Sequence, residues 1–534
     1  MGCLPDLAEC GIRGTEDEEH YHFEELCVFL ARCTQFSKHD AFTTQNASAP
    51  MQSLLLAALA GAAAALAARA LVRRLRLALR LRGLDKAQLL AERRRHFCAA
   101  QSISYANTDP LLIVSGHGAT LVDEAGRRFL DTRNNVAHVG HAHPAVAAAV
   151  AEQVATLNTN TRYLHPNVCA LAKKLLATMP APLSDGVVFF VNSGSEANDL
   201  AVRLARAFNP RSELTLVVDH AYHGHTITAL GLSPYKFEHR SFKGKGKPSW
   251  VTKCPAPDTY RGPHRGADAG ARYAEPVVAA CEAACAGGGG GVCAFFIESG
   301  MSVAGVIMPP DGYLAACYHA VRAAGGVCIA DEVQTGMGRF GSSWWGFEQQ
   351  CVVPDIVTMG KSCGNGMPLA AVVCTRAVSD AFATGPEYFN TFGGNPVCTA
   401  AGLAVFETIA KEDLRARATA TGTFLREALA ALAGEPAGVL LGDVRGCGLF
   451  MGIEFVRDRE SREPATAETS FICSRLKDVH RILTSIDGPH DNVLVVKPPL
   501  CFGEPEARRL VGALRCELMA LASVDLTKVS HTPT

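Results

Sequence analysis

The sequence predicts an α/β fold with a mostly parallel central sheet, helices on both of its faces, and a smaller α+β domain. Two runs in the middle of the chain, 327–330 and 356–359, are apolar at nearly every position, which is typical of buried parallel strands. Residues 411–521 mix amphipathic helical patterns with short strand-like runs such as 493–496, which indicates the smaller domain. A chain of 534 residues is also too long for one simple core.

The composition is that of a globular protein. Hydrophobic residues make up 48% of the chain and charged residues 19%, and the formal net charge is -1, so nothing indicates a surface for nucleic acid. The 20 cysteines lack the short paired spacings of a zinc site. In a long α/β chain they indicate reduced thiols rather than a disulfide scaffold.

Four segments are expected along the chain. Residues 1–85 form a leader, 86–155 the N-terminal part of the small domain, 156–410 the large domain that carries the site, and 411–524 the C-terminal part of the small domain. No internal repeat is present.

The leader changes character at Met51. Residues 54–68 form an unbroken apolar run, which is shorter than the roughly 20 residues that span a bilayer. Arginines follow it, and no acidic residue occurs between Met51 and Asp85. This composition is typical of an organelle transit peptide, so we expect a mitochondrial protein. The alternatives are a helix at 53–82 that stays on a membrane surface, or a cytoplasmic protein.

Asp331 and Lys361 each follow one of the two central apolar runs. Ligands of open α/β sheets bind beyond the carboxyl ends of the strands, so we expect this acid and this amine to face one site. Pyridoxal phosphate needs a lysine for its Schiff base and a carboxylate that keeps its ring nitrogen protonated. The pair therefore indicates pyridoxal 5'-phosphate as cofactor, and the alternative is a structural ion pair at the sheet edge.

A turn at 192–198 follows another apolar run and begins a helical stretch. Free backbone N–H groups at the start of a helix, together with its positive dipole end, favour a bound phosphate. The alternative is an ordinary helix cap formed by Ser193 or Ser195. Tyr222, just past a further apolar run, is placed to stack on a flat ring, unless it is a core aromatic.

Three histidines lie close together at His138, His141 and His143. Glycine and proline turn residues surround them, and no matching carboxylate is evident, so we predict no metal site here.

Taken together, these motifs and the loop 387–396 resemble the class III (ornithine/GABA-type) aminotransferases, which are fold-type I pyridoxal-phosphate enzymes. The resemblance runs from about Ile103 to Leu521 and keeps the family's motif order. It implies that Lys361 carries the cofactor covalently and moves the substrate proton. Asp331 would pair with the ring nitrogen and Gln334 with the phenolic oxygen.

The resemblance also assigns further roles. Gly194 and Ser195 would hold the cofactor phosphate, and Tyr222 would stack on the ring. Thr391 would reach the phosphate bound by the neighbouring subunit, which implies a homodimer with shared sites and leaves a tetramer open. Glu298 corresponds to an acid near the amine substrate.

Within the family the chain is most similar to the phospho-lyases that act on O-phosphoethanolamine and 5-phosphohydroxy-L-lysine. The stretches that carry this likeness are 135–141, 157–165, 219–225, 233–237, 257–263, 388–394 and 487–490. It implies elimination of phosphate from a phosphorylated amine to give aldehyde, ammonia and phosphate. The alternative is a transaminase that moves an amino group from an amino acid such as alanine to an oxo acid such as glyoxylate. A catalytically silent binding protein is disfavoured, because Lys361, Asp331 and Gln334 are all present.

A phosphorylated substrate needs a cationic clamp, for which Arg162 is the candidate; the alternative is a structural ion pair. Three departures bear on the reaction. Met367 stands where the phospho-lyases have histidine, and it cannot hydrogen-bond a phosphate as an imidazole does. Val495 stands where the family often has a basic residue, with Lys497 two residues later. The sequence of residues 334–338 is more similar to that of the general aminotransferases than to that of the phospho-lyases.

Overall fold

The computed structural model describes Gly61, residues 85–105 and residues 109–521. The predicted leader, 1–85, therefore lies almost wholly outside the described residues. The chain divides into two compact units, 1–96 and 97–534. Helix α3 (Lys86–His96) makes up most of what is described of the first unit. Among the described helices, none combines the length and the apolar character that crossing a bilayer requires.

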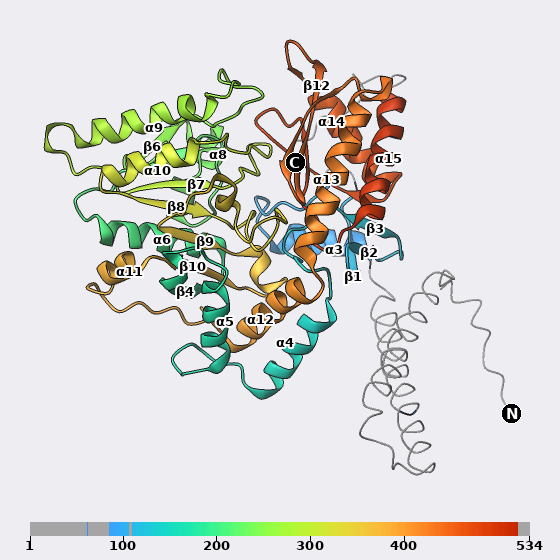
Figure 1. Ribbon diagram of the computed structural model, residues 1–534. Helices are drawn as coiled ribbons and strands as arrows, with labels where there is room; N and C mark the ends of the chain where they lie inside the picture. Colours follow the sequence, from blue (N-terminus) through green and yellow to red (C-terminus); the bar gives the residue numbers. More distant parts are fainter. Residues whose placement is uncertain (1–60, 62–84, 106–108, 522–534) are drawn as a thin grey trace, which may run out of the picture. The chain divides into compact units, whose positions relative to one another are not determined.

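A seven-stranded sheet forms the centre of the second unit (Figure 1). Its order is β4-β10-β9-β8-β7-β5-β6. Neighbouring strands from β9 to β6 run parallel, and β10 runs antiparallel to both β9 and β4. The strands are β4 (Val187–Val191), β5 (Thr215–Val218), β6 (Val251–Cys254), β7 (Ala294–Glu298), β8 (Val327–Asp331), β9 (Ile356–Met359) and β10 (Ala370–Cys374). The predicted, mostly parallel central sheet is confirmed.

Helices cover both faces of this sheet. Along β5, Leu216 packs in a cluster with residues of α9 (Ala269–Cys285) and α10 (Tyr313–Ala323), whereas Val217 packs with residues of α6 (Gly194–Phe208). Figure 1 shows α9 and α10 on one side of the sheet and α6 on the other. Burial on both faces explains why the central strands are apolar at nearly every position.

The seven-stranded sheet and the helices on it form the large lobe of the unit, and the two smaller sheets with their helices form the second lobe. The other helices of the unit lie around the large sheet and in the second lobe. They are α4 (Pro144–Thr156), α5 (Pro166–Leu176), α7 (Ile227–Gly231), α8 (Pro234–Phe237), α11 (Arg376–Phe382), α12 (Pro396–Lys411), α13 (Leu414–Ala433), α14 (Thr466–Asp478) and α15 (Glu504–Leu521). Helix α12 is largely buried and packs against α4 and α5.

The second lobe combines strands from both ends of the unit. One sheet has the order β1-β2-β3-β14, and the other has the order β11-β12-β16-β15, with β13 paired to β12. Strand β14 runs parallel to β3, with Ile482 opposite Leu130, so residues far apart in sequence share one sheet. The strands are β1 (Ile113–His117), β2 (Thr120–Asp123), β3 (Arg128–Asp131), β11 (Leu441–Cys447), β12 (Phe450–Asp458), β13 (Glu463–Pro464), β14 (Ile482–Leu483), β15 (Ser485–Asp487) and β16 (Val493–Val496). The boundaries at 155 and 410 stay a prediction.

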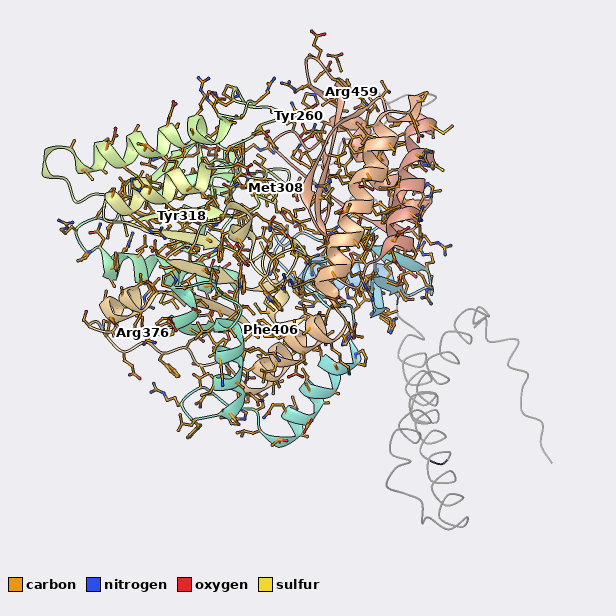
Figure 2. The ribbon with its side chains drawn as sticks, viewed as in Figure 1. Tyr260, Met308, Tyr318, Arg376, Phe406 and Arg459 are labelled. Carbon is orange, nitrogen blue, oxygen red and sulfur yellow. The ribbon has the colours of Figure 1, made fainter. Side chains whose placement is uncertain are left out.

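Side chains fill the region between the two lobes. Figure 2 labels Tyr260 and Met308 in this region, and Met308 packs against Phe450 of β12 and Val495 of β16. The second lobe therefore lies against the central sheet beside the ends of its parallel strands. Those strands end at one edge, where β7 ends in Glu298 and β8 ends in Asp331.

Candidate active site

A cavity of about 300 Å³ opens at the carboxyl ends of the parallel strands. The residues that line it are Val136, Asn192, Ser193, Gly194, Ser195, Asn198, Tyr222, His223, Gly224, Glu298, Asp331, Val333, Gln334, Lys361, Gly366, Met367, Pro368 and Leu369. Seven of the nine residues to which the sequence analysis assigns a cofactor or substrate role are in this lining: Lys361, Asp331, Gln334, Gly194, Ser195, Tyr222 and Glu298. Arg162 and Thr391 are not.

The carboxylate of Asp331, buried at the end of β8, accepts hydrogen bonds from three donors. Its Oδ2 receives Asn198 Nδ2 and His223 Nδ1, each at 2.8 Å, and its Oδ1 receives the backbone N–H of Val333 at 3.0 Å. These three donors fix the direction of the carboxylate. A carboxylate held in one orientation suits a protonated heterocyclic nitrogen.

Lys361 follows β9 and begins a short 3-10 helix, Lys361–Gly364. Its φ of 26° is a rare backbone conformation for a residue with a side chain. Burial lowers the pKa of its amine, the nearby Asp331 opposes this effect, and Lys497 adds to it. Within the described residues its ammonium forms no hydrogen bond or salt bridge. An amine of lowered pKa without a committed partner suits formation of an imine.

The turn that the sequence predicts to bind phosphate lies at the start of α6. Ser193 is the N-cap and accepts a hydrogen bond from Glu196 N at 3.2 Å, so a helix cap is present at this residue. Gly194 and Ser195, in the first turn, line the cavity with the positive end of the helix. A side chain at position 194 would collide with Val333, because its Cβ would lie 2.8 Å from Cγ2. The cap and the anion-binding geometry therefore coexist.

Tyr222 and Glu298 are linked through the backbone. Glu298 Oε1 accepts from Tyr222 N at 3.0 Å, and its Oε2 accepts from Ser302 N at 3.2 Å. Burial raises the pKa of Glu298 to about 7; nearby His223 opposes the rise and Asp331 adds to it. Glu298 is therefore a carboxyl group that changes charge near neutral pH.

Four contributors to the site did not receive a role from the sequence: Asn198, His223, Asn135 and Lys497. Gln334 Oε1 accepts from Asn135 Nδ2 at 2.9 Å and from Lys497 Nζ at 3.1 Å. This leaves the Gln334 amide nitrogen available to donate. Lys497 is a single basic residue that directly follows the apolar run 493–496. This position at the end of a strand was the sequence feature that could have indicated a role in the site.

The three clustered histidines have separate structural partners. His138 Nε2 lies 2.7 Å from Met337 O, His141 Nε2 lies 2.7 Å from Asp131 Oδ2, and His143 Nε2 lies 3.0 Å from Glu412 Oε1. In the part of the chain that the structure describes, no group of histidine, cysteine or acidic residues is arranged to hold a metal ion.

Arg162 and Thr391 lie at the surface, outside the cavity of their own chain. Arg162 Nη1 lies 3.2 Å from Glu387 Oε1, and its guanidinium carbon lies 3.9 Å from the centre of the Phe389 ring. The backbone of Thr391 accepts from Thr161 N at 3.3 Å. In a single chain Arg162 is thus part of a surface ion pair, which was the alternative to a clamp.

These side chains fit pyridoxal phosphate on their donor chemistry. Lys361 is an uncommitted amine of lowered pKa, and Asp331 is a carboxylate oriented by three donors. Gly194 and Ser195 lie at a helix start, and Tyr222 contributes an aromatic face to the same cavity. Each part of the cofactor therefore has a suitable side chain or backbone group within one lining.

Comparison with known proteins gives consistent relatives. The family model described as aminotransferase class-III matches residues 103–517. A Drosophila melanogaster protein named alanine–glyoxylate aminotransferase 2-like is 48% identical, over 81% of this chain and 87% of the relative. A Caenorhabditis elegans protein named ethanolamine-phosphate phospho-lyase homolog 1 is 39% identical, over 80% and 93%.

A solved structure of a phospholyase from Arthrobacter, in complex with phosphoethanolamine, is 40% identical with a TM-score of 0.74, and it covers 82% of this chain and 100% of that one. Relatives from Arabidopsis thaliana and Homo sapiens carry the word mitochondrial in their names.

The pKa of Glu298 predicts a pH-dependent difference in stability. Its pKa in the folded protein lies above its ordinary value, so the stability it contributes is complete below about pH 4.5 and is lost as the pH rises through about 7. Glu298→Gln mimics the protonated form. We expect the unfolding temperature of the cofactor-free variant to exceed that of the parent by a margin that grows from pH 5 to pH 8.

The exposed Glu387 provides a matched control, because the margin for Glu387→Gln should not change in this way. A margin for Glu298→Gln that stays constant with pH would contradict the assignment.

Proposed function

Because the chain belongs to the class-III aminotransferase family, whose members use pyridoxal phosphate, we propose that it is a phospho-lyase that eliminates phosphate from a phosphorylated amine. The substrate would be O-phosphoethanolamine or 5-phosphohydroxy-L-lysine, and the products an aldehyde, ammonia and phosphate. Support comes from relatives named or solved as phospho-lyases. The observation that carries the proposal is Lys497, a nearly buried cation beside the cofactor residues.

The chemistry assigns a task to each residue of the cavity. Bound pyridoxal phosphate supplies an electron sink for negative charge on the carbon beside the substrate nitrogen. Asp331 would hold the ring-nitrogen proton, and Gly194 would face the cofactor phosphate. Lys361 Nζ would take the proton from the substrate carbon. The bond between the next carbon and the phosphate oxygen would then break, and phosphate would leave with the electron pair. Water would hydrolyse the remaining enamine to the aldehyde and ammonia.

Lys497 is placed to hold an anion in this reaction. Its Nζ lies 2.7 Å from Ser302 Oγ, 3.1 Å from Gln334 Oε1 and 3.6 Å from Asp487 Oδ2. Burial lowers the pKa of Lys497 and raises that of Asp487, and the positive charge of nearby Arg133 acts to lower both. Lys497 and Arg133 thus bring two cationic side chains close to Asp487, and their N–H donors suit a phosphate dianion.

The other departures from the family pattern increase the importance of Lys497. Val495 is buried in an apolar cluster, so the position that is often basic in the family supplies no charge here. Met367 lines the cavity with a thioether, which is only a weak hydrogen-bond acceptor. Lys497 is therefore a residue of this chain that can recognise a phosphate group in place of those positions.

A transaminase is the second candidate. It is favoured by the name of the Drosophila relative. It is also favoured by the sequence of residues 334–338, which is more similar to that of general aminotransferases than to that of phospho-lyases. Both reactions begin with removal of the same proton. They differ in that a transaminase returns a proton to the cofactor and requires an oxo acid to complete its cycle.

The decisive measurement is phosphate release from O-phosphoethanolamine and from 5-phosphohydroxy-L-lysine with no oxo acid present. We expect the purified protein to release phosphate, aldehyde and ammonia in equal amounts over many turnovers. Amino transfer from alanine to glyoxylate should be much slower. Release of phosphate only when an oxo acid is added, or none at all, would contradict the proposal.

Two variants serve as controls for this assay. Lys361→Ala should lose turnover, because no amine remains to remove the proton. Lys497→Met should raise the KM for phosphoethanolamine by about tenfold to a hundredfold, since hydrogen bonds to charged groups contribute about 1.5–3 kcal/mol.

A homodimer follows as part of the same proposal. Apolar side chains are exposed on two adjoining segments, with Tyr163 at 69%, Leu164 at 101% and Phe392 at 61%. The segments are joined because Thr161 Oγ1 donates to Asn390 O at 2.8 Å. Arg162 and Thr391 lie on this surface, so a second copy that covers it would bring both residues toward the partner's cavity.

Hybrid dimers test this arrangement. Lys361→Ala and Arg162→Ala chains carrying different tags are co-expressed, and the mixed dimer is isolated. If Arg162 serves the partner's cavity, one site of the hybrid has both residues, and phosphate release should recover to about half of the parent activity. No recovery, or an Arg162→Ala homodimer with unchanged KM, would contradict the role of Arg162.

Mitochondrial targeting remains a proposal for the segment between Met51 and Asp85, supported by its composition and by the names of two relatives. Residues 51–95 fused to a fluorescent protein should direct it to mitochondria. Replacing the arginines between 69 and 82 with glutamate should abolish the effect, because transit peptides depend on their positive charge. A diffuse cytosolic signal from the unchanged fusion would contradict targeting.

A further inference from the structure

Helix α8 carries Lys236. This lysine belongs to the stretch 233–237, and the proposed reaction assigns it no role. The helix is fixed to the wall of the cavity through its N-cap Ser233, whose Oγ accepts from His223 N at 2.8 Å and donates to Ala229 O at 2.6 Å. The backbone of Tyr235 also donates to Ala221 O at 3.3 Å. The position of Lys236 is therefore set by the segment that carries Tyr222 and His223.

The ammonium of Lys236 lies against two aromatic rings. Its Nζ is 4.5 Å from the centre of the Tyr235 ring and 5.7 Å from that of Tyr222. The two rings meet edge to face with their centres 6.3 Å apart. Tyr222 lines the cavity, whereas Tyr235 is 46% exposed. Lys236 thus lies between the cavity wall and solvent, and this partial burial lowers its pKa.

Lys236 has no carboxylate partner among the described residues, unlike Lys253, Lys497 and Arg162. Lys253 Nζ lies 3.1 Å from Asp219 Oδ1 and also pairs with Glu238. Lys497 and Arg162 pair with Asp487 and Glu387. Aromatic faces attract an ammonium but accept none of its hydrogen bonds in the way that an oxygen does. Lys236 therefore keeps both its charge and its donors for a further acceptor.

We propose that Lys236 binds the anionic end of the substrate at the entrance of the cavity, with Tyr222 and Tyr235 holding its ammonium in place. The ligand class is a phosphate monoester dianion. The choice of this ligand class rests on the proposed function. The proposal that Lys236 binds an anion at this entrance is independent of it. A charge held by rings rather than by a carboxylate can attract an anion without first breaking an ion pair.

The test separates anion binding from turnover by using ethyl phosphate, which has the phosphate but no amine. Ethyl phosphate is titrated into the pyridoxal-phosphate-loaded protein by calorimetry. We expect Lys236→Met to weaken binding by about tenfold or more, because a charge-assisted hydrogen bond is lost. Lys236→Arg should bind within about twofold of the parent, since the positive charge is retained. Lys253→Met, a nearby lysine neutralised by two carboxylates, should bind as the parent does.

A purely structural role is distinguished by two further readouts. If Lys236 acted only by holding Tyr222, then Lys236→Met would change kcat and the cofactor absorbance band. We expect a raised KM for phosphoethanolamine with kcat and the band unchanged, and unaltered inhibition by ethanolamine, which has the amine but no phosphate. Equal affinity of parent and Lys236→Met for ethyl phosphate, or no binding to the parent, would overturn the inference.

The inference and the proposed function fail separately. If the parent releases phosphate from phosphoethanolamine while Lys236→Met binds ethyl phosphate unchanged, the role of Lys236 is wrong and the phospho-lyase stands. If binding depends on Lys236 but no phosphate is released, the residue is an anion site and the reaction assignment is wrong.

Discussion

The site depends on the hydrogen bonds that fix the Asp331 carboxylate at the end of β8. Asn198 comes from α6, His223 from the loop after β5, and Val333 from the turn after β8 itself. A single buried carboxylate therefore joins three segments of the large lobe. Because three donors fix its orientation, this carboxylate would need no reorganisation to hold a proton on a ring nitrogen, and preorganised charges contribute to catalysis in this way.

A second buried side chain, the guanidinium of Arg339, joins the large lobe to the second lobe. The Arg339 guanidinium donates to Leu449 O and to Pro498 O, and its Nη2 lies 3.1 Å from His138 Nδ1. Burial lowers the pKa of Arg339 to about 9. Because Pro498 follows Lys497 directly, this contact fixes the segment that brings Lys497 to Gln334. The positions of Arg339, Lys497 and Gln334 are thus linked.

Much of the fold and of the cofactor site could be predicted from local sequence. Strands buried on both faces leave continuous apolar runs, and the residues at their ends face one edge, so Asp331 and Lys361 were identifiable without coordinates. What could not be predicted depends on contacts across long stretches of chain. Lys497 meets Gln334 across 163 residues, and Asn135 meets it across 199. No local pattern encodes such a pairing, because it arises only when the second lobe packs on the sheet.

Arg162 is a residue whose type predicts a role in the site but whose position in one chain does not support it. Its residue type suits a phosphate clamp, but in one chain its charge is paired with Glu387 and it lies outside the cavity. Sequence alone cannot say whether such a residue acts on its own site or on a neighbour's, since that depends on how surfaces of two copies meet.

The balance of charge around the cavity bears on the choice between lyase and transaminase. Asp331 would be compensated by a protonated ring nitrogen, and Glu298, with a pKa of about 7, loses much of its negative charge near neutral pH. Lys497 and Arg133 bring positive charge beside Asp487, and burial raises the pKa of that carboxyl group. The remaining positive charge suits a phosphate that carries two negative charges better than a carboxylate that carries one, because Coulomb attraction scales with ligand charge. As the pH rises through 7, ionisation of Glu298 would reduce that advantage, because burial keeps this carboxyl group protonated only below its raised pKa.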